Sequence, residues 1–93
     1  MKIEQRRPFF RAFKRLKPAE KQYVEEAIRH IATQPAIGEF KRGDLSGFYV
    51  HKFKMNRQLL LLAYRYNEQV DTLYLEAFGP HENFYRDLKK YNM

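Results

Sequence analysis

The apolar positions in the first third of the chain recur with the period of an α-helix. In residues 8–16, "PFFRAFKRL", apolar side chains fall at i, i+4 and i+7, which predicts a helix with one apolar face. A second helix is predicted from Pro18, because proline suits the first turn of a helix and residues 24–31 keep the same period. Pro35 disfavours helical backbone at the residue before it, so this helix should end within residues 32–34.

After a glycine-containing loop, "IGEFKRGDLSG", the pattern changes to the alternation of a β-strand. Residues 48–55 place Phe53 and Met55 on one face and Lys52 and Lys54 on the other. The alternation predicts a strand with one basic face.

The remaining pattern predicts more sheet and a last helix. Residues 58–66 and 70–78 are β-compatible apolar runs joined by short polar connections that suit hairpins, and residues 2–5 could add an edge strand. In residues 84–91, apolar side chains again fall at i, i+4 and i+7, so a terminal helix can pack on the sheet. The expected fold is α+β: a small twisted antiparallel sheet of three or four strands with two N-terminal helices and a C-terminal helix.

Length and composition narrow the class of protein. A chain of 93 residues is expected to form one domain, residues 1–93. The absence of cysteine excludes a disulfide scaffold and cysteine-based metal or redox sites. The longest apolar run, "LLLLAY", is far shorter than the roughly 20 residues of a membrane helix, so we expect a cytoplasmic protein without a membrane partner.

Positive charge is concentrated rather than spread evenly. The net charge is +7, and residues 5–18 contain six basic residues and no acidic one. Such asymmetry favours a polyanionic partner, because lysine and arginine contacts to phosphates release counterions. A solvated basic surface and an acidic protein partner are the two other interpretations.

The sequence carries no conventional cofactor, metal or nucleophile motif. It has no phosphate-binding glycine loop, no HExxH and no nucleophile elbow, so no cofactor and no metal are expected. What remains is a set of lysine, arginine, histidine and tyrosine residues on a strand face and where the last strand meets the last helix. Cleavage of RNA through its own 2′-hydroxyl needs a base, positive charge at the phosphate and an acid for the leaving oxygen, and these residue types supply all three.

Four residues are the catalytic candidates. Lys52 and Lys54 could bind neighbouring phosphate oxygens, and either could act as the base. His81, in "GPHENFY", could transfer a proton near neutral pH, and Tyr85 could stack on a base one helical turn later. The structural alternatives are an exposed basic strand face for the lysines, a helix-start residue for His81 and a half-buried edge aromatic for Tyr85.

The other two histidines are not catalytic candidates. His51 shares a strand face with Phe53 and Met55, so we interpret it as a partly buried structural residue. His30 lies on the second predicted helix and is expected at the surface.

The element order, together with "FYVHKFKMNRQLLLLAYRY", "VDTLYLEAFGPHENFY" and "RDLKKY", resembles the RelE/ParE superfamily of bacterial type II toxins. The resemblance covers nearly the whole chain and is firmest from Phe40 onward. It implies metal-free cleavage of mRNA, often on the ribosome, and a cognate antitoxin that neutralises the toxin.

The resemblance also implies roles for individual residues. Lys52 and Lys54 match the paired lysines of the second strand of RelE. His81 falls where RelE has a catalytic arginine and YafQ-like toxins have a histidine. Tyr85 approximates the stacking tyrosine of the terminal helix, and Phe84 matches a phenylalanine of the YafQ-like toxins.

The sequence departs from the RelE pattern in its central strand as well as at His81, and the additional histidine and aspartate of the YafQ-like toxins have no clear counterpart here. The arginine of the RelE central strand falls near Leu61, so Arg57 or Arg65 would have to replace it, and Arg65 is better placed if it shares a face with Lys52. The predicted RNA-binding residues are Arg57, Arg65, Phe84 and Arg86. ParE-like members of the superfamily inhibit DNA gyrase instead, so a gyrase inhibitor and an inactive antitoxin-binding protein are the alternative functions.

Overall fold

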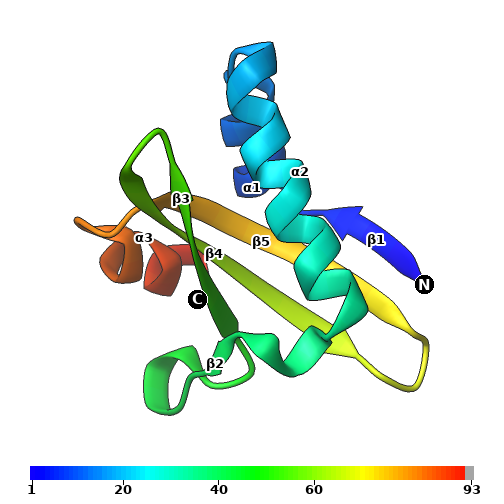
Figure 1. Ribbon diagram of the computed structural model, residues 1–93. Helices are drawn as coiled ribbons and strands as arrows, with labels where there is room; N and C mark the ends of the chain where they lie inside the picture. The colour runs from blue at the N-terminus through cyan, green and yellow to red at the C-terminus, as the bar shows by residue number, and fades with distance from the viewer. Residues whose placement is uncertain (92–93) are drawn as a thin grey trace.

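The computed structural model describes residues 1–91 and contains one five-stranded sheet with helices on both faces (Figure 1). The helices are α1 (Arg7–Lys14), α2 (Pro18–Thr33) and α3 (Phe84–Tyr91). The strands are β1 (Lys2–Gln5), β2 (Glu39–Phe40), β3 (Tyr49–Met55), β4 (Gln58–Asn67) and β5 (Thr72–Pro80). Two short 3₁₀ helices, η1 (Pro35–Ile37) and η2 (Gly43–Leu45), flank β2.

The predicted α+β fold is confirmed, with two differences in the sheet. The strand order is β1-β5-β4-β3-β2, so there are five strands rather than three or four. β1 forms the expected edge strand but runs parallel to β5, which makes the sheet mixed. β2 lies within the segment that the sequence predicted as a loop. It was not predicted as a strand because two residues are too few to show an alternating pattern.

The two faces of the sheet carry two separate clusters of buried residues. On the face covered by α1 and α2, the cluster includes Phe9, Val24, Ile31, Leu60, Leu62, Tyr64, Leu73 and Leu75. On the face covered by α3, it includes Leu45, Phe48, Val50, Leu61, Ala63, Ala77, Phe84 and Leu88. Because β4 is central, its alternate side chains enter both clusters, which explains why "LLLLAY" is apolar at consecutive positions.

The turn between β3 and β4 brings the two longest antiparallel strands together. Asn56 and Arg57 both have positive φ, 49° and 72°, as in the two-residue turns whose twist matches a hairpin. Tyr23 in α2 donates a hydrogen bond from its hydroxyl to Asn56 Oδ1 at 3.1 Å, which ties the turn to the helix.

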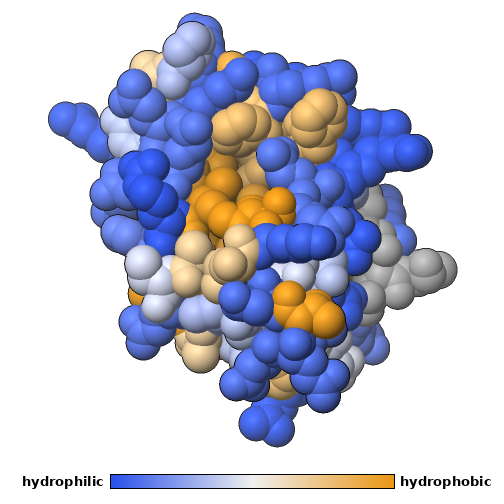
Figure 2. Space-filling model, turned by 90° about the vertical axis from the view of Figure 1, so that its right-hand side faces the viewer, coloured by the Kyte–Doolittle hydropathy of each residue, from blue (hydrophilic) through white to orange (hydrophobic). Residues whose placement is uncertain are grey.

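One side of the molecule shows how apolar and hydrophilic side chains are distributed on the surface (Figure 2). Figure 2 shows the side that lies at the right of Figure 1, where apolar side chains gather in a central hollow surrounded by hydrophilic ones. No helix within residues 1–91 combines the length and the apolar character needed to span a membrane.

Candidate active site on the α3 face of the sheet

The strand register places the two lysines of β3 in line with the end of β5. Lys52 lies opposite Leu61 in β4, and Leu61 lies opposite Gly79 in β5. Lys54 lies opposite Leu59, one step nearer to the hairpin turn on the same face. Since neighbouring strands are about 4.8 Å apart, the backbones of β3 and β5 are separated by about 10 Å at this level.

His81 and Tyr85 lie just beyond the end of β5. Phe84 and Leu88 anchor α3 in the buried cluster on this face, with relative exposures of 6% and 1%. The backbone N–H of Phe84 donates to the carbonyl of His81 at 3.2 Å, which holds the turn before the helix. The rings of His81 and Tyr85 are 5.8 Å apart in an edge-to-face arrangement, so the predicted pair is in contact.

Lys41, next to β2, joins Tyr85 to the basic strand face. Its Nζ lies 4.9 Å from the centre of the Tyr85 ring and forms an ion pair with Glu39. Glu39 lies opposite Val50, and Val50 is two residues from Lys52 on the same face of β3. Lys41, Glu39 and Tyr85 therefore form a continuous polar edge beside Lys52.

The charges at this edge stabilise each other. The hydrogen bond from Lys41 lowers the pKa of the Glu39 carboxyl, and the charge of Lys52 lowers it further. The same bond to Glu39 raises the pKa of Lys41, with a further contribution from Tyr85. Glu39 is therefore ionised and Lys41 is protonated at neutral pH.

Sequence reasoning missed Glu39 and Lys41 because it assigned them to a loop. The only sequence pattern that indicates a strand here is three residues long: in "EFK", two charged residues flank Phe40. In the structure, the ring of Phe40 packs against that of Tyr49 on the opposite face of the sheet, with 5.0 Å between the ring centres. Such an alternation over three residues predicts a strand only when its partner strand is known.

The structure separates Arg65 from this edge. Arg65 lies on the same face as Lys52, as required, but four residues along β4 from Leu61, which is about 13 Å of strand. Its guanidinium lies 4.0 Å from the centre of the Phe48 ring and 3.5 Å from Glu76 Oε2. Arg65 belongs to a second basic group there, with Arg6, which also pairs with Glu76 at 3.7 Å.

The other predicted RNA-binding residues occupy different settings. Arg57 is exposed at the tip of the β3–β4 turn, and Arg86 is exposed on α3 with an ion pair to Asp87 at 3.8 Å. Phe84 is buried, so its ring anchors α3 and cannot stack on a base without leaving the core. We therefore leave Phe84 out of the candidate RNA surface.

The basic face of α1 adjoins the same end of β5. A cleft of about 370 Å³ between α1 and α3 is lined by Arg11 and Arg15 on one side and by Pro80 and Glu82 on the other. Because Pro80 and Glu82 flank His81 in the chain, the charge of the N-terminal segment lies near the histidine.

The other two histidines meet between α2 and β3. His51 is half-buried, as predicted, and His30 is exposed, with 6.5 Å between the ring centres. Burial lowers the pKa of His51, and the neighbouring His30 lowers it further. Within residues 1–91, no group of three or more histidine, aspartate or glutamate side chains is arranged to hold a metal ion.

Comparison with known protein families shows to which family the chain belongs. The family of ParE-like toxins of type II bacterial toxin-antitoxin systems matches residues 3–89. The chain belongs to this family. The RelE/ParE superfamily that the sequence resemblance indicated is therefore confirmed for this ParE-like toxin. A sequence comparison with curated proteins found no match.

Solved structures share the fold of the toxin at low sequence identity. The YoeB/ParE toxin from Agrobacterium tumefaciens is 17% identical, with a TM-score of 0.71 over 87% of this chain and 99% of that one. A chain of the intact Escherichia coli RelBE toxin-antitoxin complex is 13% identical, with a TM-score of 0.67 over 85% and 94%. A chain of the Mycobacterium tuberculosis RelBE2 complex is 20% identical, with a TM-score of 0.68 over 86% and 96%.

Proposed function

We propose that this toxin is a ribosome-dependent endoribonuclease that cuts mRNA without a metal ion and is held in check by a cognate antitoxin. The observation that carries the proposal is the arrangement of Lys52, Lys54, His81 and Tyr85 on one face, linked by the Glu39–Lys41 pair. Toxin-antitoxin complexes among the structural neighbours support the antitoxin.

The reaction needs a proton acceptor at the 2′-hydroxyl. The sequence pointed to Lys52 or Lys54, and a further candidate is the carboxylate of Glu39, which lies opposite Val50 on the strand face of the two lysines. We assign the base to Glu39, because a carboxylate accepts a proton without first losing one. The two lysines then bind the non-bridging oxygens of the phosphate, where negative charge grows in the transition state.

The bond changes follow from these assignments. Glu39 takes the proton of the 2′-hydroxyl, and the 2′-oxygen forms a bond to phosphorus as the bond to the 5′-oxygen breaks. His81 in its protonated form gives a proton to that 5′-oxygen. The products are a 2′,3′-cyclic phosphate and a 5′-hydroxyl, and water later returns Glu39 and His81 to their starting protonation states.

Tyr85 and Lys41 position the RNA. The Tyr85 ring is partly exposed between His81 and Lys41, and its exposed part would stack on a base next to the cut. The arginines of α1 extend the positive surface beyond His81.

Primer extension on a reporter mRNA in a reconstituted translation reaction tests the proposal. The wild-type toxin should give cuts in phase with codons, and a folded His81→Ala variant should not. His30→Ala is the matched control and should cut normally, since His30 lies on α2 away from the site. Intact mRNA with the wild-type toxin would contradict the proposal, and inhibition of DNA supercoiling would then support the gyrase alternative.

A further inference from the structure

The outer edge of β1 presents backbone groups that point away from the sheet. Within residues 1–91, β1 ends the strand order and has a strand neighbour in β5 alone. The backbone N–H groups of Lys2 and Arg6 donate to carbonyls in residues 71–75 at 3.0 and 2.8 Å, so they point toward β5. Since successive residues of a strand direct their backbone groups to opposite sides, those of Ile3 and Gln5 point outward. The edge is a template for one more strand.

The side chains of β1 differ between the two faces of the sheet. Ile3 pairs with Leu73, which is buried under α1 and α2, so Ile3 lies on that face, where it is 46% exposed. Lys2 and Glu4 alternate onto the other face and are both exposed. Among the residues that the structure describes, neither of these two charges has an ion-pair partner. The edge therefore offers one lysine and one glutamate, two residues apart, to whatever pairs with it.

We propose that this edge binds the same edge of a second copy of the toxin, as an antiparallel pair centred on Ile3. The two Ile3 residues would lie opposite each other at the two-fold axis and exchange both backbone hydrogen bonds, as their outward groups allow. Lys2 of each copy would then lie opposite Glu4 of the other, which gives two cross-strand pairs of opposite charge. The edge is thus complementary to itself, as a two-fold interface requires.

Backbone direction and charge together select this register. An axis between two residues would place outward groups opposite inward ones, so the axis must pass through a residue. An axis at Lys2 would place Lys2 opposite itself, and an axis at Glu4 would place Glu4 opposite itself, and like charges at such positions are destabilising. An axis at Gln5 would bring Ile3 against α1, which begins at Arg7. Only the axis at Ile3 pairs opposite charges along the strand.

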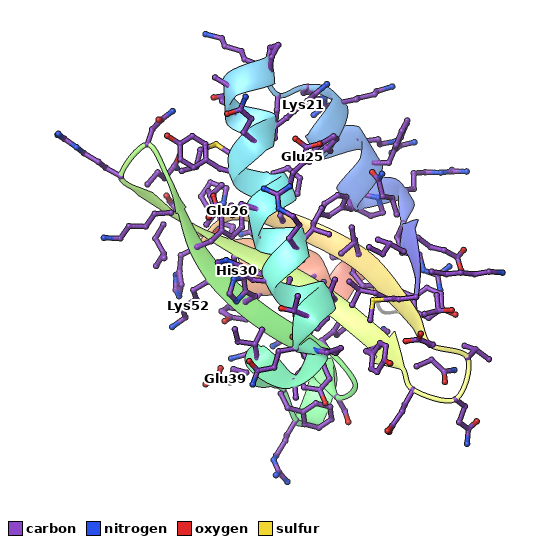
Figure 3. All side chains as sticks on the ribbon, turned by 45° about the vertical axis from the view of Figure 1, so that its right-hand side comes forward. Lys21, Glu25, Glu26, His30, Glu39 and Lys52 are labelled. Atoms are coloured by element: carbon purple, nitrogen blue, oxygen red, sulfur yellow. The ribbon has the colours of Figure 1, made fainter. Side chains whose placement is uncertain are left out.

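The pairing is independent of the proposed nuclease function. In Figure 3, β1 lies at the right-hand side of the sheet, whereas Glu39 and Lys52 lie toward the opposite side. The net charge of +7 on each copy opposes association, but at about 0.15 M salt the Debye length is about 8 Å, so charges far from the seam are screened. Because a seam of four residues per copy is small, we expect a weak dimer.

Exchanging the charges tests the register. Lys2→Glu lowers the net charge of the chain from +7 to +5, and Glu4→Lys raises it to +9, since each change shifts it by two. In the proposed register both variants place like charges opposite each other, so each should associate about tenfold or more weakly than the wild type. An equimolar mixture of the two should associate, because positions 2 and 4 then carry opposite charges in every mixed pair. Sedimentation equilibrium at about 0.15 M salt and up to about 1 mM toxin measures this.

The double variant Lys2→Glu with Glu4→Lys is the matched control. It keeps the net charge at +7 and restores both pairs, so it should associate like the wild type. A wild-type toxin that stays monomeric over the whole concentration range would overturn the proposal and leave the edge to a strand of another protein. Stronger association of Lys2→Glu than of the wild type would also overturn it, because net charge rather than strand register would then control association.

A cysteine at position 3 tests the position of the axis. Residues in a hydrogen-bonded antiparallel pair have Cα atoms about 5.5 Å apart, a distance that a disulfide bridges. The chain has no cysteine of its own, so Ile3→Cys in a glutathione redox buffer should form disulfide-linked dimers through this seam. Ile37→Cys is the matched control, since Ile37 is 43% exposed but lies in η1, beside β2 at the other edge. The linked fraction should be at least about tenfold higher for Ile3→Cys, and equal fractions would contradict the proposed axis.

Discussion

At the scale of single residues, Glu39 is the side chain whose setting differs most from the one that the sequence suggested. It lies in a predicted loop, yet the structure places it on the strand face of the lysines, where Lys41 pairs with it and lowers its pKa. Lys41 also lies over Tyr85. A single ion pair thus connects the proposed base to the residue that is proposed to stack on the RNA.

Replacing Glu39 with glutamine should slow mRNA cleavage by about 10²-fold or more, because general-base catalysis contributes about that factor. Asp44→Asn is the matched control: it removes the same charge from an exposed carboxylate that pairs with Lys89 at 3.6 Å on α3. Single-turnover cleavage with both variants measures the effect. Rates within about twofold of each other would remove Glu39 from the reaction and return the role of base to the lysines.

The half-buried His51 should make the stability of the toxin depend on pH. Its pKa is lowered in the folded state, so the unfolded chain binds the proton more readily, and stability falls as the pH drops below about 6.5. The groups around it are Tyr23, Glu26, His30 and Lys54. Denaturant unfolding between neutral and mildly acidic pH should show this loss in the wild type and a smaller loss in His51→Gln; the same loss in both would contradict the assignment.

At the scale of elements, the site depends on how the segment before β2 is fixed. Tyr64 in β4 donates a hydrogen bond from its hydroxyl to the carbonyl of Pro35 at 2.6 Å and accepts one from the N–H of Gly38 at 3.0 Å. Only glycine fits at position 38 without a shift of its neighbours, because a Cβ there would lie 2.8 Å from the Tyr64 hydroxyl oxygen. One buried tyrosine therefore sets the position of the strand that carries Glu39.

Tyr64→Phe should lower the free energy of unfolding by about 1–3 kcal/mol, because it leaves a part-buried N–H and a carbonyl without their partner. Cleavage should also slow, since β2 loses its anchor. Tyr66→Phe is the control, as it removes only an exposed hydrogen bond to Asp71 at 2.8 Å. Urea unfolding measures both variants, and an equal cost for the two would show that Tyr64 does not anchor the segment.

How far the sequence predicts each element depends on the range of its contacts. The helices and the three long strands have a period that persists over several turns or pairs, so the sequence predicts them within a few residues. β2 has two residues, and the parallel direction of β1 is set by contacts with β5 about seventy positions away, from Ile3 to Leu73. The same limit applies to the site: the pattern predicts the lysine face and the contact between His81 and Tyr85, whereas Glu39 and Lys41 join them only through pairing with β3.

At the scale of the whole molecule, positive charge surrounds the site on several elements. The net charge is +7, and Arg11 in α1 and Arg15 just after it line the cleft that reaches the segment around His81. β3 adds two exposed lysines. RNA that crosses the α3 face would therefore meet cations before and after the cut.

The affinity of the toxin for ribosomes should fall steeply as salt concentration rises, because each phosphate contact releases counterions. Arg11→Ala combined with Arg15→Ala should weaken binding and make the salt dependence less steep. Lys2→Ala combined with Lys90→Ala removes the same charge from exposed positions that do not line the cleft and should change the slope less. Sedimentation at several salt concentrations measures this, and identical slopes for the two double variants would contradict a specific role for α1.

The most direct test of the proposed chemistry is a change in the RNA. After the cut has been mapped on a reporter mRNA, the same mRNA is prepared with a single 2′-deoxy nucleotide immediately 5′ of the cut bond, and both are translated with the wild-type toxin. The proposed mechanism predicts that cleavage at this position disappears, because the attacking 2′-oxygen is missing, and that the unmodified mRNA yields a 2′,3′-cyclic phosphate. Cleavage that persists on the modified mRNA would contradict the mechanism.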